Sequence, residues 1–143
     1  MFTSIVVGTD GSETANTAVD LAVALARACG ATLHIVNAFR TPTGAGQIAA
    51  GGALVPGDAL GHMVGSEASQ QLLDGVASRA TGVSVETHTV NDSPAEAVIG
   101  VAEQVGADLI VVGNKGMERR VFGSVPNTIA HKAPCNLLIA KTT

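Results

Sequence analysis

The chain has 143 residues, which is the length of one domain, here 1–143, with a sizeable core. Its net charge of -4 and aromatic content of 2% argue against a nucleic-acid-binding module, which would be basic and rich in stacking side chains. No run approaches the roughly 20 apolar residues of a membrane span and no signal peptide is apparent, so we expect a cytoplasmic protein without a membrane partner.

The N-terminal part predicts a strand, a helix and a second strand. The first strand is Ser4–Gly8, and Ser12 is a good N-cap for the helix that follows. Apolar residues recur at helical spacing as far as Cys29, and Gly30 then stops the helix. The second strand is Thr32–Phe39. Because a short helical crossover joins the two strands, we expect them to be parallel neighbours.

Residues 40–62 predict a long loop, since they contain six of the 17 glycines and two prolines. A surface connection is one interpretation. A flap over a ligand is a second, and a contact with a partner subunit through the apolar tip at 49–55 is a third.

The rest of the chain alternates helices and strands. The patterns predict a surface helix at 64–80, an edge strand at 83–90, a helix at 94–105, a buried strand at 109–112, a helix after Gly123-Ser124 that ends at about Lys132, and a last strand at 136–141. This order indicates an α/β fold, a doubly wound five-stranded parallel sheet with helices on both faces, Rossmann-like in type.

Several reactive side chains have simple structural interpretations. We expect His88 to be solvated and not a ligand, and Cys29 and Cys135 to be buried, reduced thiols. His131 and Lys132 lie near a helix C-terminus, where positive side chains interact favourably with the helix dipole.

The strand at 109–112 leads into a glycine-rich, basic loop and a helix start. Gly113 and Gly116 allow the chain to turn, and Lys115, Arg119 and Arg120 supply positive charge. A helix start presents free N–H groups and the positive end of the helix dipole, so we predict a phosphate site here. If this strand neighbours the first one, a crevice opens between Thr9-Asp10 and Gly113. Asp10 has a second interpretation, an Asx turn or helix cap.

The chain resembles the universal stress protein family along its whole length. The resemblance lies in Val6-Val7-Gly8-Thr9-Asp10-Gly11-Ser12, Ser93-Pro94-Ala95-Glu96-Ala97-Val98, Val111-Val112-Gly113-Asn114-Lys115-Gly116 with Gly123-Ser124, and Ala133-Pro134-Cys135-Asn136-Leu137-Leu138-Ile139. It implies an adenine nucleotide alpha hydrolase-like fold, an adenine nucleotide as ligand, a homodimer through the last strand, and a stress-response role without a well-defined reaction.

The resemblance also implies which residues hold the nucleotide. Thr9 and Asp10 lie on the nucleoside side, and Ala38 offers backbone groups to adenine. Ribose and phosphates meet the loop, and the distal phosphates meet the helix start. The implied set is Thr9, Asp10, Ala38, Val112, Gly113, Asn114, Lys115, Gly116, Arg119, Arg120, Gly123, Ser124 and Val125.

The loop departs from the ATP-binding pattern that the chain resembles, Gly-x2-Gly-x9-Gly-Ser/Thr. Only 117–122 separate Gly116 from Gly123, so the loop is three residues shorter and loses roughly 10 Å of contour. Either Arg119 and Arg120 replace the lost backbone contacts and ATP binds, or the loop cannot close over a γ-phosphate and the ligand is AMP, a cyclic nucleotide or none. ATP, with Mg2+ held weakly at Asp10, is the preferred expectation.

Two classes of function therefore remain. One is a nucleotide-binding signalling module, and the other is a dimeric interaction module that binds a protein partner with an empty pocket. Because the chain has no Walker motif and no nucleophile with an identifiable base, we expect at most slow ATP hydrolysis.

Overall fold

The computed structural model describes residues 1–41, 47–48, 54–55, 57–114 and 124–142. Side-chain positions are described for these residues except 47–48, 54–55, 57–63 and 124. The predicted loop positions Lys115, Gly116, Arg119, Arg120 and Gly123 lie outside the described residues.

The centre of the molecule is a five-stranded parallel sheet with the strand order β5-β2-β1-β6-β7. Its strands are β1 (Ser4–Gly8), β2 (Thr32–Phe39), β5 (Ser84–Asn91), β6 (Leu109–Gly113) and β7 (Asn136–Ala140). β1 pairs with both β2 and β6, so the direction in which strands are added reverses between β1 and β6. The doubly wound five-stranded sheet is therefore confirmed, including the neighbouring β1 and β6.

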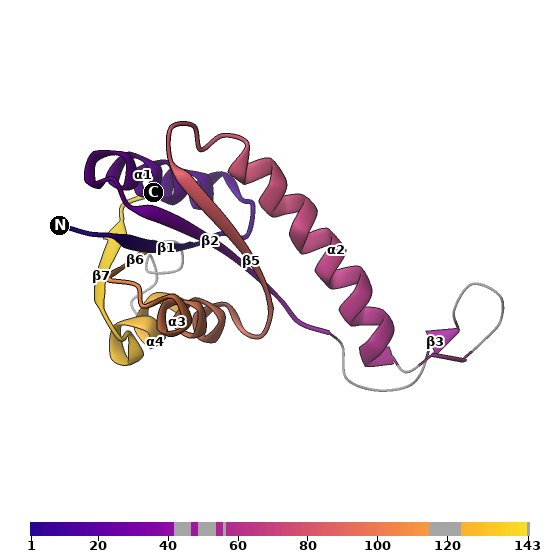
Figure 1. Cartoon of the computed structure of the whole chain (residues 1–143). Helices are drawn as coiled ribbons and strands as arrows, with labels where there is room; N and C mark the ends of the chain where they lie inside the picture. Colours follow the sequence, from indigo (N-terminus) through magenta and orange to yellow (C-terminus); the bar gives the residue numbers. More distant parts are fainter. Residues whose placement is uncertain (42–46, 49–53, 56, 115–123, 143) are drawn as a thin grey trace.

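Helices cover both faces of the sheet (Figure 1). They are α1 (Glu13–Cys29), α2 (Gly57–Ala77), α3 (Pro94–Val105) and α4 (Ser124–Lys132). Side chains of α1 and α2 pack with Leu33 and Ile35 on one face. Side chains of α3 and α4 pack with Val6 and Val36 on the other. Because successive strand residues point to opposite faces, these apolar runs fill two separate cores.

The predicted helix ends agree with the local geometry. The Ser12 hydroxyl accepts a hydrogen bond from Ala15 N at 3.2 Å and caps α1. Gly30 and Gly106 end α1 and α3 in the left-handed region, with φ of 67° and 63°. Glycine takes this conformation without the Cβ clash that penalises other residues.

The prediction of a long loop over 40–62 is wrong in part. A two-stranded antiparallel ribbon, β3 (Gln47–Ile48) with β4 (Leu54–Val55), lies inside this range, and α2 begins at Gly57 instead of residue 64. The sequence did not predict this early start of α2, because the glycines in its first turns have low helix propensity. Gly65 has a packing role, since a Cβ there would lie 2.6 Å from Cδ2 of Phe39 on β2.

Candidate functional site

A cavity of about 360 Å³ opens where the strand order reverses in the sheet. We call it the switch-point cavity. It lies beyond the carboxyl ends of β1, β2 and β6 and against the first turns of three helices. Its lining residues are Gly8, Thr9, Asp10, Ser12, Thr14, Ala15, Val36, Asn37, Ala38, Pro94, Val98, Val112, Gly113, Val125, Pro126 and Thr142. Ligands of open α/β sheets bind at this position.

Six of the predicted site residues line this cavity, and they come from three elements, β2, β6 and α4, and from the turn after β1. They are Thr9, Asp10, Ala38, Val112, Gly113 and Val125. The pairing of β1 with β6 brings Thr9 and Gly113 to the same edge, although about a hundred positions separate them in the sequence. The structure thus brings the two ends of the predicted crevice together.

The turn after β1 is held by its own polar groups. Thr9 N donates to Val36 O at 2.9 Å, and the Thr9 hydroxyl accepts from Gly11 N at 3.1 Å. Asp10 Oδ1 accepts from Ser12 N at 2.9 Å, which is the Asx turn given as the second interpretation of this residue. One carboxylate oxygen therefore shapes the turn and keeps Asp10 at the rim of the cavity.

Asn37 is a site residue that sequence reasoning missed. The residue is 8% exposed, and its Nδ2 donates to Thr9 O at 2.7 Å. This bond ties the end of β2 to the turn after β1. The available signal was a polar residue near the carboxyl end of a strand that neighbours β1, but its partner is known only once the strands are paired.

The end of β6 is joined to the end of β7 by Asn114. Its Oδ1 accepts hydrogen bonds from Thr142 N at 2.7 Å and from the Thr142 hydroxyl at 2.9 Å, and its backbone N donates to Ala140 O. Asn114 is not among the residues that line the cavity, whereas Thr142 is. A Cβ on Gly113 would lie 3.2 Å from Thr142 Cγ2, so glycine permits this close approach.

The helix start predicted for phosphate binding lies at the cavity. α4 begins at Ser124, and Val125 and Pro126 in its first turn line the cavity wall. The first N–H groups of a helix have no acceptor within the helix. Pro126 has no N–H group and cannot donate. The predicted cations Lys115, Arg119 and Arg120 belong to the part of the chain outside the described residues.

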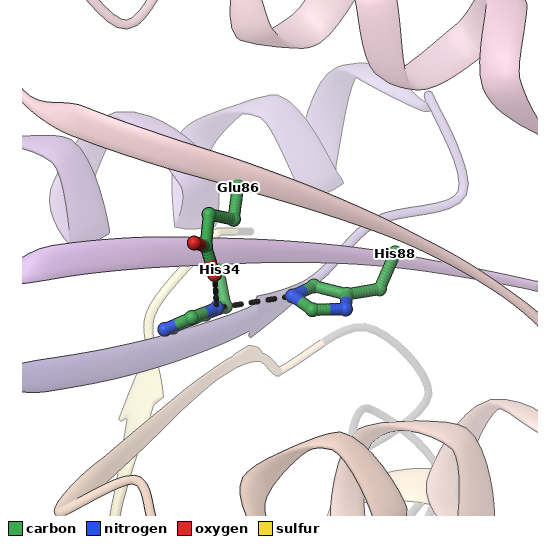
Figure 2. Close-up of side chains that lie close together, drawn as sticks. All are labelled: His34, Glu86 and His88. Atoms are coloured by element: carbon green, nitrogen blue, oxygen red, sulfur yellow. Dashed lines mark hydrogen bonds and ion pairs between the residues drawn. The ribbon is translucent and has the colours of Figure 1, made fainter. Parts of the chain in front are cut away.

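A second group of polar side chains lies on the sheet, formed by His34 of β2 with Glu86 and His88 of β5 (Figure 2). His34 Nδ1 lies 3.0 Å from His88 Nε2 and 3.1 Å from Glu86 Oε2. The expectation of a solvated His88 is wrong, because its ring is half-buried against His34.

Both imidazoles in this group are held toward the neutral form. Burial is the main cause that lowers the pKa of His34, and the neighbouring His88 lowers it further, whereas Glu86 opposes the shift. Burial also lowers the pKa of His88, again against the influence of Glu86. A neutral imidazole has one nitrogen lone pair available as an acceptor or as a metal ligand.

Three other expectations need correction or refinement. Cys29 and Cys135 are free thiols, but both are half-buried instead of buried. Partial burial is the larger cause that raises the pKa of Cys135, and the negative charge of Asp108 is the smaller one. Lys132, at the C-terminal end of α4, forms an ion pair with Glu96 of α3 at 2.7 Å. Its position suits the helix dipole, but its nearest charged partner is on another helix.

The fold and the cavity define a class of protein, a doubly wound α/β domain with a ligand-sized cavity at the point where the strand order reverses. The family model described as "Universal stress protein family" matches residues 1–141. The chain therefore belongs to the universal stress protein family.

Individual relatives agree with this assignment over their full lengths. Universal stress protein Rv1636 of Mycobacterium tuberculosis is 32% identical over 148 residues, covering 99% of this chain and 98% of its own. YxiE of Bacillus subtilis is 30% identical over 149 residues, covering 99% of this chain and 100% of its own.

Solved structures also match. A universal stress protein crystallised in complex with cAMP has a TM-score of 0.73 and 30% identity, with 99% of this chain and 98% of that chain covered. A universal stress protein from Archaeoglobus fulgidus in complex with dAMP shares the fold, with 23% identity and a TM-score of 0.59, and the match covers 97% of this chain and 98% of that chain. Among the helices that the structure describes, none has the length and apolar character needed to cross a bilayer.

Proposed function

We propose that this protein binds an adenine nucleotide in the switch-point cavity and acts as a ligand-controlled module in stress adaptation. The observation that carries the proposal is the cavity itself. Its volume of about 360 Å³ lies within the roughly 300–1,000 Å³ of small-molecule sites. Its walls come from the carboxyl ends of strands at the reversal point, where α/β sheets hold their ligands.

The lining residues fit such a ligand. Val36, Ala38, Val98 and Val112 form apolar walls suited to a flat base, and Thr9, Asp10, Ser12 and Thr142 supply a polar rim. A bound nucleotide would bring phosphate charge to the first turn of α4, where Val125 lines the cavity. Lys115, Arg119 and Arg120 would add charge-assisted hydrogen bonds to phosphate oxygens.

The number of phosphates depends on how the shortened loop meets the ligand. ATP, with Mg2+ near Asp10, is the form expected from the sequence. Two neighbours whose names state a nucleotide hold monophosphates, cAMP and dAMP. The test must therefore compare adenine nucleotides of different phosphate count.

The experiment is a thermal-shift titration with ATP, ADP, AMP and cyclic AMP, each with and without Mg2+. A ligand that binds only the folded state raises the melting temperature once its concentration exceeds the Kd. Ala15→Phe in α1 fills part of the cavity, and Ala24→Phe on an exposed turn of the same helix is the matched control. We expect a shift in the wild type and in Ala24→Phe, and a much smaller one in Ala15→Phe.

The opposite result has a clear meaning. If no nucleotide raises the melting temperature at millimolar concentration, or if Ala15→Phe responds like the wild type, the cavity is not a nucleotide site. The interaction-module function would then be favoured.

A second copy of the chain is the partner we propose at the edge of the sheet. β7 is an edge strand of the described sheet, and its Ile139 is 40% exposed. Two edge strands can pair across a two-fold axis and bury such a side chain. Sedimentation velocity should show a dimer in the wild type and a smaller species in Ile139→Lys, and a monomeric wild type would contradict this assignment.

A further inference from the structure

The group of His34, Glu86 and His88 is built on two paired strands. The register aligns His34 with Glu86, and Val36 with His88, across the parallel pair β2–β5. His34 and Val36 point to the same face of β2, and Glu86 and His88 to the same face of β5, because strand side chains alternate with a period of two. The pairing therefore places three potential ligands on one face of the sheet (Figure 2).

The donor atoms of the three side chains converge. All lie within 4.8 Å of one another, and His34 Nδ1 is 3.0 Å from His88 Nε2 and 3.1 Å from Glu86 Oε2. Two N–H groups pointing at each other would clash, so at most one of the two facing ring nitrogens carries a proton. Two ring nitrogens and one carboxylate oxygen thus surround one point, and a cation bound there would take the place of that proton.

The distances suit a small divalent ion. Tetrahedral zinc has Zn–N and Zn–O bonds of about 2.0–2.2 Å, which places neighbouring ligand atoms roughly 3.3–3.6 Å apart. The two short contacts of His34 need to open by only a few tenths of an ångström. The remaining pair, Glu86 with His88, lies within 4.8 Å and needs to close by no more than about 1.5 Å to reach this spacing. Glu86 and His88 lie on β5, which has a neighbouring strand on one side only. Their side chains can therefore adjust without moving the buried side chains of the core.

The side chains of this group differ in how far they are exposed to solvent. The His34 side chain is 6% exposed and fixed within the sheet, whereas that of Glu86 is 61% exposed. An ion can therefore approach from the carboxylate side, and three protein ligands leave a fourth position for water. None of the three residues lines the switch-point cavity, so this place is distinct from the proposed nucleotide site.

We propose that His34, Glu86 and His88 form a binding site for a divalent transition-metal ion, Zn2+ by preference, which links the edge strand β5 to β2. Two imidazole nitrogens with one carboxylate select Zn2+ over Mg2+ and Ca2+, which prefer oxygen ligands. The bound ion stabilises the folded chain, because the unfolded chain does not hold the two strands in register.

The test uses the full-length protein freed of metal with a chelator and kept free of nucleotide. Zn2+ is titrated against a chromophoric chelator, and Co2+ is added separately to record its visible d–d absorption. The variants Glu86→Gln and His88→Gln each remove one ligand from the partly exposed strand and avoid the buried His34. The matched control is His131→Gln, which removes an exposed histidine at the end of α4.

We expect the wild type and His131→Gln to bind a single Zn2+ per chain and to give the intense Co2+ spectrum of a tetrahedral site. Glu86→Gln and His88→Gln should bind at least about tenfold more weakly and lose that spectrum while remaining folded by circular dichroism. Absence of saturable binding at micromolar Zn2+, equal affinity in all four proteins, or equal binding of Mg2+ would each overturn the proposal. Because no nucleotide is present, this outcome is independent of the proposed function.

Discussion

Replacing Asn37 with alanine tests how the turn after β1 is held in place. The Asn37 amide donates to Thr9 O at 2.7 Å, and both residues are 8% exposed. Without the amide, the carbonyl group stays in the interior with no side-chain donor. A buried acceptor left without a donor lowers the free energy of unfolding by about 1–3 kcal/mol.

A control with the same chemistry is available at the other end of the sheet. Asn136 Nδ2 donates to Asp108 O at 3.2 Å, but this residue is exposed, so water can replace its amide. Both residues lie in strands, and the intrinsic effect of changing asparagine to alanine largely cancels between them. We expect Asn136→Ala to change the stability by no more than about 0.5 kcal/mol.

The assay is urea-induced unfolding of the wild type and both variants, with the linear extrapolation to water. At this chain length each 1 kcal/mol corresponds to about 2–4 °C in melting temperature, so Asn37→Ala should melt about 2–12 °C below the wild type. Equal losses in Asn37→Ala and Asn136→Ala would refute the reasoning, because they would show that burial of the Thr9 carbonyl does not matter.

Two further predictions concern stability. Gly11→Ala should unfold at lower urea than Gly30→Ala. Both glycines have positive φ, 79° and 67°, where an alanine costs about 1–2 kcal/mol of stability. Of the two, only Gly11 would place its new Cβ against another side chain, Leu72 Cδ1 at 2.9 Å, and this contact adds about 0.5–1.5 kcal/mol of rotamer strain. Equal urea midpoints for the two variants would contradict this prediction. Burial raises the pKa of Asp108, but hydrogen bonds led by those from Thr3 lower it overall, so its folded pKa lies below the unfolded value of about 3.8. As the pH falls, the unfolded chain binds the proton first. The stabilisation from the Asp108 carboxylate is therefore present above pH 3.8 and is lost as the pH falls through the folded pKa. Asp108→Asn should therefore lower the urea midpoint at pH 7 and approach the wild type at pH 2, and a pH-independent difference would contradict it.

Much of the fold was predictable from the sequence because its signals are local. Ser12 caps α1 with its own hydroxyl, and Gly30 and Gly106 end helices because of their own backbone freedom. The buried strand at 109–112 was evident from a short apolar run. These features depend on a few adjacent residues, so the linear chain already contains the information.

The start of α2 required tertiary information. Glycines within it make helix propensity low, and the close approach of Gly65 to Phe39 shows that packing on β2 contributes to its placement. Propensity describes an isolated segment and does not include this contact.

The candidate sites divide in the same way. The motifs after β1 and β6 were visible in the sequence, and the predicted pairing of these strands placed Thr9 and Gly113 at one cavity. The partners that hold the polar groups were not visible. The contact of Asn37 with Thr9 crosses 28 positions, and that of His34 with His88 crosses 54. Such contacts depend on which strands are neighbours and in what register, and a shift of one residue would send His88 to the opposite face of the sheet. The sequence by itself therefore determined the order of the strands and helices of the main sheet and the place of the cavity. Only the tertiary structure decided which distant side chains meet, because their contact depends on strand register.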